Sequence, residues 1–149
     1  MGLVADLGPG PTAVDTAAFI YLIEEDAAYL PLVLPLFTEA DRGDRVLVTS
    51  TLTLLEVLVV PYRAGNVQLA ERYEQLLTRS RGLRLIDMSR DLVRAAAQLR
   101  ATVGVKTPDA LQLAAALLAG CQTFVTNDRR LPAVPGLKVL QLSSYAAKK

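Results

Sequence analysis

Histidine is absent from the 149 residues, and cysteine occurs only once, at Cys121. The absence of histidine removes the commonest general base, the usual zinc ligand and every mechanism that pairs histidine with serine or cysteine. Any catalysis must therefore use carboxylates, Lys, Arg, Tyr, Ser, Thr or the single thiol. One cysteine excludes an internal disulfide, which favours a reducing compartment such as the cytoplasm.

Aromatic residues are also scarce, at 5% of a chain that is 52% hydrophobic. A core made mainly of Leu, Val and Ala favours a layered α/β or all-α protein over an aromatic-rich β-sandwich. The net charge is only +1, from 16 Lys and Arg against 15 Asp and Glu. Binding to nucleic acid would therefore need a local basic patch, or a bound cation that offsets the acids.

Long apolar runs are missing as well. The densest stretches, Leu52–Val60 and Leu113–Ala119, are far shorter than the ~20 residues that span a bilayer. Met1–Pro11 has neither the basic start nor the apolar run of a signal peptide. We therefore expect a soluble protein with no membrane partner.

The length fits one domain. The turn residues Gly8-Pro9-Gly10-Pro11 predict a flexible lead-in over residues 1–11, followed by a single domain over 12–145 and a tail over 146–149. Short β-rich segments are predicted as strands at Thr12–Thr16, Arg45–Ser50, Leu83–Met88, Thr123–Thr126 and Leu137–Leu142. Segments with helical spacing separate them, which predicts a parallel sheet with helices on both faces and right-handed crossovers.

Four acids lie where this arrangement brings chain segments together. Asp15 lies at the carboxyl end of the first predicted strand and Asp128 follows the fourth, so both should emerge at the carboxyl edge of the sheet, where open parallel sheets bind ligands. Glu56 lies in an apolar helix, Thr51–Arg63, that begins at the same edge. We expect this helix to be buried, which would leave Glu56 without solvent. Asp109 opens the helix that leads into the fourth strand.

Four carboxylates at one edge would repel one another strongly. A divalent cation relieves this repulsion, and ligands that are all oxygen favour Mg²⁺ or Mn²⁺ over zinc. Carboxylate-bound Mg²⁺ typically takes phosphate oxygens as further ligands and lowers the pKa of a bound water. The sequence therefore predicts a phosphodiester substrate.

Four segments of the chain together resemble the motifs of PIN-domain ribonucleases, and most closely those of VapC-type toxins from toxin–antitoxin pairs. These segments are Val14-Asp15-Thr16-Ala17, Ser50 with Glu56, Thr107-Pro108-Asp109-Ala110-Leu111-Gln112-Leu113-Ala114, and Thr126-Asn127-Asp128-Arg129-Arg130-Leu131. The resemblance spans roughly residues 12–145. It implies a three-layer fold with strand order 3-2-1-4-5, RNA as substrate, a homodimer and a small protein antitoxin.

By position, the resemblance assigns Asp15, Glu56, Asp109 and Asp128 to the metal site, with Thr126 as a supporting hydroxyl. We also count Thr16, Ser50 and Asn127 as supporting residues. Lys106, Arg129 and Arg130 border the predicted site as candidate phosphate contacts, although ordinary surface charge explains them equally well. A lead-in of about a dozen residues is longer than such toxins usually carry.

Each acid also has a structural explanation when taken singly. Asp15 can cap the first helix, Asp109 suits the dipole of its helix, and Asp128 can begin a turn. All four explanations holding together is a weaker account than a shared site. Together with the family resemblance, the shared site predicts a metal-dependent endoribonuclease that uses a metal-activated water. The resemblance implies that cleavage leaves a 5′-phosphate and a 3′-hydroxyl.

Other functions remain open to test. One is a catalytically inactive PIN-like module that binds RNA or a protein, and another is a PIN nuclease of RNA processing that has no antitoxin. An aspartyl phosphatase using Asp15 as nucleophile is disfavoured, because that chemistry normally needs a second acid at the position of Ala17. The chain has no P-loop motif.

Overall fold

The computed structural model describes residues 2–146, so the end of the predicted tail, residues 147–149, lies outside it. The described chain contains five strands, seven α-helices and one short 3₁₀ helix. In chain order these are α1 (Leu3–Leu7), β1 (Thr12–Val14), α2 (Thr16–Ile23), α3 (Leu30–Asp41), β2 (Leu47–Ser50), α4 (Thr51–Arg63), α5 (Val67–Arg79), β3 (Leu83–Ile86), α6 (Arg90–Val103), α7 (Thr107–Leu118), β4 (Thr123–Thr126), β5 (Lys138–Gln141) and η1 (Leu142–Ser144).

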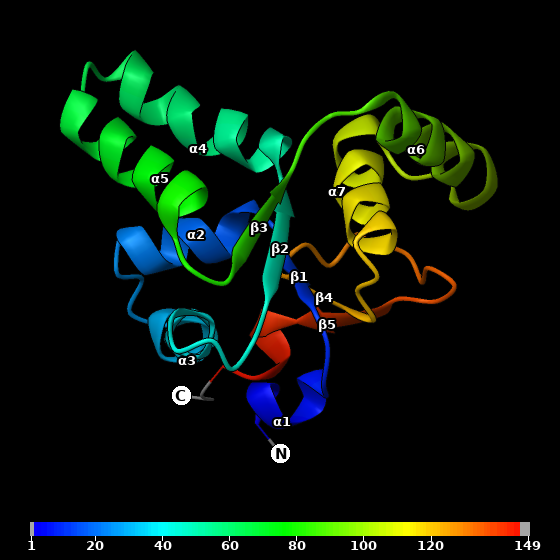
Figure 1. Cartoon of the computed structure of the whole chain (residues 1–149), viewed down its shortest axis with the longest axis horizontal. Helices are drawn as coiled ribbons and strands as arrows, with labels where there is room; N and C mark the ends of the chain where they lie inside the picture. Colours follow the sequence, from blue (N-terminus) through cyan, green and yellow to red (C-terminus); the bar gives the residue numbers. More distant parts are fainter. Residues whose placement is uncertain (1, 147–149) are drawn as a thin grey trace.

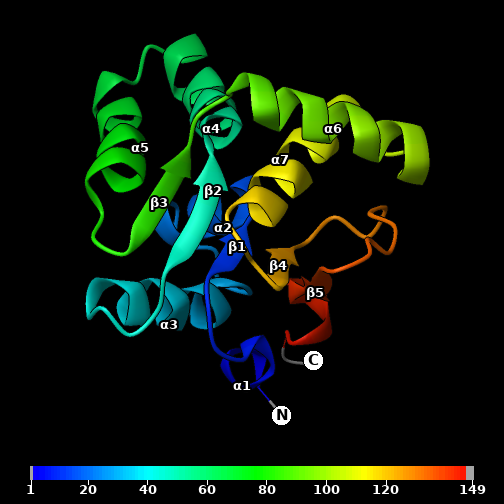
Figure 2. The same cartoon turned by 45° about the vertical axis from the view of Figure 1, so that its right-hand side comes forward.

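The sheet is parallel throughout, and its order is β3-β2-β1-β4-β5. Strand β1 lies at the centre, where the strand order changes direction, and it pairs with β2 on one side and β4 on the other (Figures 1 and 2). The predicted fold class and strand order are thus confirmed. This topology brings the ends of β1 and β4 side by side, with Val14 opposite Val125.

Two apolar cores cover the two faces of the sheet. One lies under α1 to α5 and contains Val14 and Val125, whereas the other lies under α6 and α7 and contains Ala13 and Phe124. Neighbouring residues on one strand therefore point to opposite cores, as the twofold periodicity of a strand requires. The figures show the two helical layers on either side of the strands.

The N-terminal segment differs from the flexible lead-in that its glycines and prolines predict. Residues Leu3–Leu7 form α1, whose Leu3 and Leu7 are buried in the first core. Asp6 accepts a hydrogen bond from the Tyr145 hydroxyl at 2.6 Å, and the backbone oxygen of Asp6 accepts one from Lys138. The glycines and prolines bend the chain after α1, and burial of Leu3 and Leu7 attaches α1 to the domain.

Helix α4 also differs from expectation. Its sequence is apolar almost all round, which predicts burial, yet only Thr53, Val57 and Pro61 are buried. Leu55, at 59% exposure, and Tyr62, at 60%, are among the side chains that face outward. Helix α4 packs on α5 and α2 along one side, and within residues 2–146 no element covers the opposite side.

No helix among the described residues is both long and apolar enough to cross a membrane.

Candidate metal centre

Asp15 joins β1 to α2 and is held from three sides. One carboxylate oxygen accepts a hydrogen bond from the backbone N–H of Ala17 at 3.1 Å, which caps α2, and the other accepts the hydroxyl of Thr126 at the end of β4. Burial raises the pKa of Asp15 from 3.8 to about 6, against the lowering effect of these hydrogen bonds and of one from the backbone of Asn127; the carboxylate of Glu56 raises it further. Asp15 is thus a half-buried acid beside a second carboxylate.

Glu56 is exposed and lies in the second turn of α4. The hydroxyl of Thr16, in the first turn of α2, donates to its carboxylate at 2.7 Å. The expected burial of Glu56 was wrong, because α4 leaves one side open to solvent. Its contact with α2 nevertheless fixes one carboxylate oxygen next to the Asp15 site.

A buried network of polar side chains lies next to Thr16, the residue that binds Glu56. The Ser50 hydroxyl donates to the side-chain oxygen of Gln112 at 2.8 Å, and the Gln112 amide donates to the hydroxyl of Thr53 at 2.7 Å. The hydroxyl oxygens of Thr53 and Thr16 are 3.3 Å apart. The network joins α7 to β2, α4 and α2, and it ends at the residue that holds Glu56.

Our sequence analysis missed Gln112 and Thr53 as supporting residues. The signal was present, because each is a polar side chain inside a helix that is otherwise largely apolar. A buried amide or hydroxyl needs a hydrogen-bond partner, and here the partners come from elements far apart in the sequence.

Asp109 lies in the first turn of α7, where the helix dipole favours an acid. Its pKa is raised, first by partial burial and then by the carboxylates of Asp128 and Glu56, while the cations Arg130 and Lys106 act in the opposite direction. The carboxylates of Asp128 and Glu56, from two other segments of the chain, therefore act on Asp109 electrostatically.

Asp128 follows β4 and points toward Arg130. Their side chains form an ion pair at 3.0 Å, and the backbone N–H of Arg130 donates to the same carboxylate oxygen. These hydrogen bonds lower the pKa of Asp128. The Thr126 hydroxyl accepts the backbone N–H of Asp128 at 3.0 Å, so Thr126 touches both Asp15 and the turn that carries Asp128.

All four acids line one cavity of about 430 Å³ at the carboxyl edge of the sheet. The cations Lys106 and Arg130 and the polar side chains of Thr16 and Gln112 line it as well. In the arrangement seen over residues 2–146, no three acids are close enough to bind one ion together. Asp128 is turned toward Arg130, and Glu56 toward Thr16, which keeps the four carboxylates apart.

Comparison with known families places this arrangement in context. The PIN domain family matches residues 12–137, which is most of the chain. The chain belongs to the PIN domain family. No match was found among curated proteins.

Solved structures with this PIN fold include several toxin–antitoxin proteins. VapBC2 from Rickettsia felis, bound to a promoter DNA fragment, aligns with a TM-score of 0.67 at 18% identity, covering 88% of this chain and 98% of that one. A toxin–antitoxin complex from Klebsiella pneumoniae gives 0.64 at 22%, covering 85% and 94%. VapC20 from Mycobacterium tuberculosis, a toxin that cleaves the sarcin–ricin loop, gives 0.64 at 20%, covering 80% and 91%. At these identities the likeness is one of fold.

The other predicted site residues of this PIN domain fall into two groups. Ser50 and Thr126 are buried and hydrogen-bonded beside the cavity, as described above. Asn127 instead joins Tyr21 to the backbone of Ser143, and Arg129 donates to the Ser143 hydroxyl at 2.6 Å. Neither Asn127 nor Arg129 lines the acid cavity.

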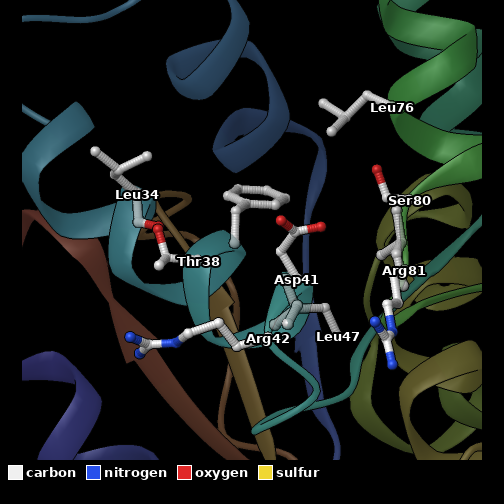
Figure 3. A pocket seen from close by; sticks show the side chains of 11 residues that line it. Leu34, Thr38, Asp41, Arg42, Leu47, Leu76, Ser80 and Arg81 are labelled. Atoms are coloured by element: carbon white, nitrogen blue, oxygen red, sulfur yellow. The ribbon is translucent and has the colours of Figure 1, made fainter.

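A second cavity of the PIN domain, of about 300 Å³, lies at the far ends of α3 and α5 (Figure 3). Leu34 and Thr38 of α3 lie on one side, and Leu76 and Ser80 on the other. Asp41 is the one acid among the described residues that line it. This cavity therefore does not combine acids from several elements, and metal chemistry is better supported at the first.

The donors at the acid cavity suit a hard divalent cation. They are carboxylate and hydroxyl oxygens, with neither sulfur nor imidazole among the lining residues. The carboxylate of Asp15 is held in place by its hydrogen bonds with Ala17 and Thr126. Asp128, whose side chain is half-buried, would have to turn away from Arg130 to join a metal shell.

Proposed function

We propose that this PIN domain is a metal-dependent endoribonuclease and the toxin of a toxin–antitoxin pair. The observation that carries the proposal is the convergence of Asp15, Glu56, Asp109 and Asp128, from four separate segments, on one cavity. Local roles such as helix capping or turn formation explain single acids, but they do not explain why all four line the same cavity. The structural neighbours support the toxin assignment, since one of them cleaves RNA and others are complexes with antitoxins.

The residues have distinct tasks in this proposal. Asp15 and Asp109 hold the cation most directly, and Glu56 and Asp128 complete the shell and orient the attacking water. Lys106 and Arg130, at the rim, contact phosphate oxygens of the substrate. When bound, Mg²⁺ or Mn²⁺ supplies positive charge that lowers the pKa of a water and stabilises charge developing on the phosphate.

A cleavage assay tests the enzyme assignment. Purified protein is incubated with total RNA and Mg²⁺ or Mn²⁺, in parallel with a chelator control and with Asp15→Asn. We expect cleavage that both controls abolish and that leaves 5′-phosphate ends. Cleavage that persists in both controls would refute the metal site.

The inactive-module alternative predicts a different pair of results. An RNA-binding or interaction domain would cleave no RNA and would also fail to bind Mn²⁺ in a calorimetric titration. The antitoxin assignment has its own test, which is coexpression with the product of an adjacent small reading frame. A toxin should copurify with that product and lose nuclease activity, whereas an RNA-processing nuclease should do neither.

A further inference from the structure

A third cavity, of about 260 Å³, adjoins the acid cavity. Lys106, Asp109 and Arg130 line both, so the two cavities share a boundary that contains two cations and one carboxylate. Beyond these shared residues, the wall of the third cavity is apolar and includes Val103 and Pro132. Asp15, Glu56 and Asp128 thus lie on one side of the shared residues, which include the carboxylate of Asp109, and an apolar recess lies on the other.

We propose that this recess, which we call the Val103 pocket (Val103, Gly104, Val105, Lys106, Asp109, Arg130 and Pro132), binds one unstacked nucleobase next to the scissile phosphate. The inference rests on the proposed function. A nucleotide joins an anionic phosphate to a flat, largely apolar ring. The pocket likewise places two cations next to an apolar recess. The phosphate would lie at Lys106 and Arg130, and the base would enter the recess.

The cations suit both parts of a nucleotide. Lys106 is exposed at the start of α7, and Arg130 has 80% of its side chain exposed. Proteins that recognise single-stranded RNA often stack its bases on apolar or aromatic side chains or on the plane of an arginine guanidinium. Arg130 lines the recess and carries such a plane, whose Nε and Nη2 atoms pair with Asp128. In our proposal the base lies between this plane and the valines.

One wall of the pocket is braced in the free protein. Arg100 donates from Nε to the backbone oxygen of Val105 at 3.1 Å and from Nη1 to the Thr107 hydroxyl at 2.9 Å, which ties the α6–α7 connection down. Gln141 donates to the backbone oxygen of Asp128, two residues before the lining residue Arg130. A recess held open by such contacts does not have to be ordered when the ligand arrives.

One consequence is that the enzyme cleaves unpaired RNA. A base that enters the Val103 pocket has left its helical stack, and leaving is easiest in a loop or a single strand. The neighbouring acid cavity then receives the phosphate of that same nucleotide. In this proposal the pocket selects RNA with an unpaired base and places the phosphate of that nucleotide at the acids.

The test compares ligands that differ only in the base. Adenosine and uridine 5′-monophosphate, ribose 5-phosphate and inorganic phosphate are titrated into protein with ¹³C-methyl valines at fixed Mg²⁺. We expect the nucleotides to bind at least about fivefold tighter than ribose 5-phosphate and to shift the methyl signals of Val103 and Val105. Equal affinity for nucleotides and ribose 5-phosphate would overturn the proposal.

Filling the recess provides the second arm. Val103→Phe should reduce nucleotide affinity to that of ribose 5-phosphate and leave Mn²⁺ affinity unchanged. Its matched control is Val93→Phe, on the same helix about 15 Å away along the axis and 52% exposed, which should alter neither. If Val103→Phe does not fold, Pro132→Phe narrows the pocket from its other wall. Retained nucleotide preference in a folded, filled variant would contradict the proposal.

RNA cleavage separates this inference from the proposed function. Metal-dependent cleavage by a protein that shows no base preference would leave the nuclease assignment standing and remove the pocket. Base-dependent binding by a protein that cleaves no RNA would keep the pocket and remove the nuclease assignment.

Discussion

Asp15 combines burial with a charge that the proposed chemistry requires. A carboxyl whose pKa is raised on folding binds its proton more tightly in the folded protein than in the unfolded chain. It therefore lowers stability progressively as the pH rises from about 4 to about 6, and the full cost remains above that range. The shift from 3.8 to about 6 corresponds to about 3 kcal/mol.

We therefore predict that Asp15→Asn stabilises the protein in chelator at pH 8, by about 1–3 kcal/mol after loss of part of its hydrogen bonding. At pH 4 the gain should vanish, because Asp15 is then protonated. Urea unfolding at the two pH values measures this, with the exposed Asp91→Asn as control. An equal gain at both pH values would show that ionisation of Asp15 does not destabilise the folded protein. Mn²⁺ should stabilise wild type but not Asp15→Asn.

Gln112 tests the polar network that our sequence analysis missed. Gln112→Leu leaves the hydroxyls of Ser50 and Thr53 without their amide partner, and we expect a loss of about 1–3 kcal/mol in the free energy of unfolding. We also expect weaker Mn²⁺ binding, because Thr53 lies next to the residue that holds Glu56. Gln98→Leu, exposed on α6, is the control. A stable Gln112→Leu variant with unaltered Mn²⁺ affinity would refute a positioning role.

At the scale of elements, α1 shows how a short helix becomes part of a domain. Five residues are too few for a stable isolated helix, so α1 depends on the burial of Leu3 and Leu7. The contacts of Asp6 with Tyr145 and Lys138 add hydrogen bonds to the end of the chain. These partners lie more than 130 positions away in the sequence, which is why local composition predicted a loose segment.

Leu7→Ala measures this dependence. Removing a side chain that is 3% exposed should cost about 2–5 kcal/mol, whereas Leu118→Ala, at a residue 53% exposed, should cost about 0.5 kcal/mol or less. Thermal or urea unfolding of the two variants decides the point. A similarly small loss of unfolding free energy in both variants would show that α1 is not packed on the domain.

At the scale of the whole molecule, the outer side of α4 is the largest departure from expectation. Leu55, Val59 and Tyr62 recur at helical spacing, and all three are exposed. A contiguous apolar stripe on a surface helix is typical of an interface. The homodimer implied by the family resemblance remains a prediction, and this stripe is the surface that we propose for it.

We expect the wild-type protein to be dimeric at micromolar concentration by light scattering after gel filtration. The double variant Leu55→Lys, Val59→Lys should be monomeric, because it places charges in an apolar contact. Val67→Lys, at a residue 61% exposed on the neighbouring helix, is the matched control and should stay dimeric. A wild-type monomer at every concentration, or a dimer in the double variant, would contradict this assignment.

Much of the fold could be predicted from the sequence, because the signals are local. Helix α4, at Thr51–Arg63, and strand β4, at Thr123–Thr126, have the predicted limits. Strand order followed from the family resemblance, and the placement of Asp15 and Asp128 followed from the ends of parallel strands. Their role as metal ligands stays a prediction, which the proposed experiments test.

The sequence by itself determined the order of the elements, the absence of imidazole from the candidate site and the edge of the sheet at which Asp15 and Asp128 emerge. Only the tertiary structure decided that α1 is packed, that α4 is covered on one side, that Gln112 reaches Thr53, and that Asp128 turns toward Arg130. Most of these features depend on contacts between segments far apart in the chain. Periodicity and composition describe a segment and its neighbours, so they do not contain that information.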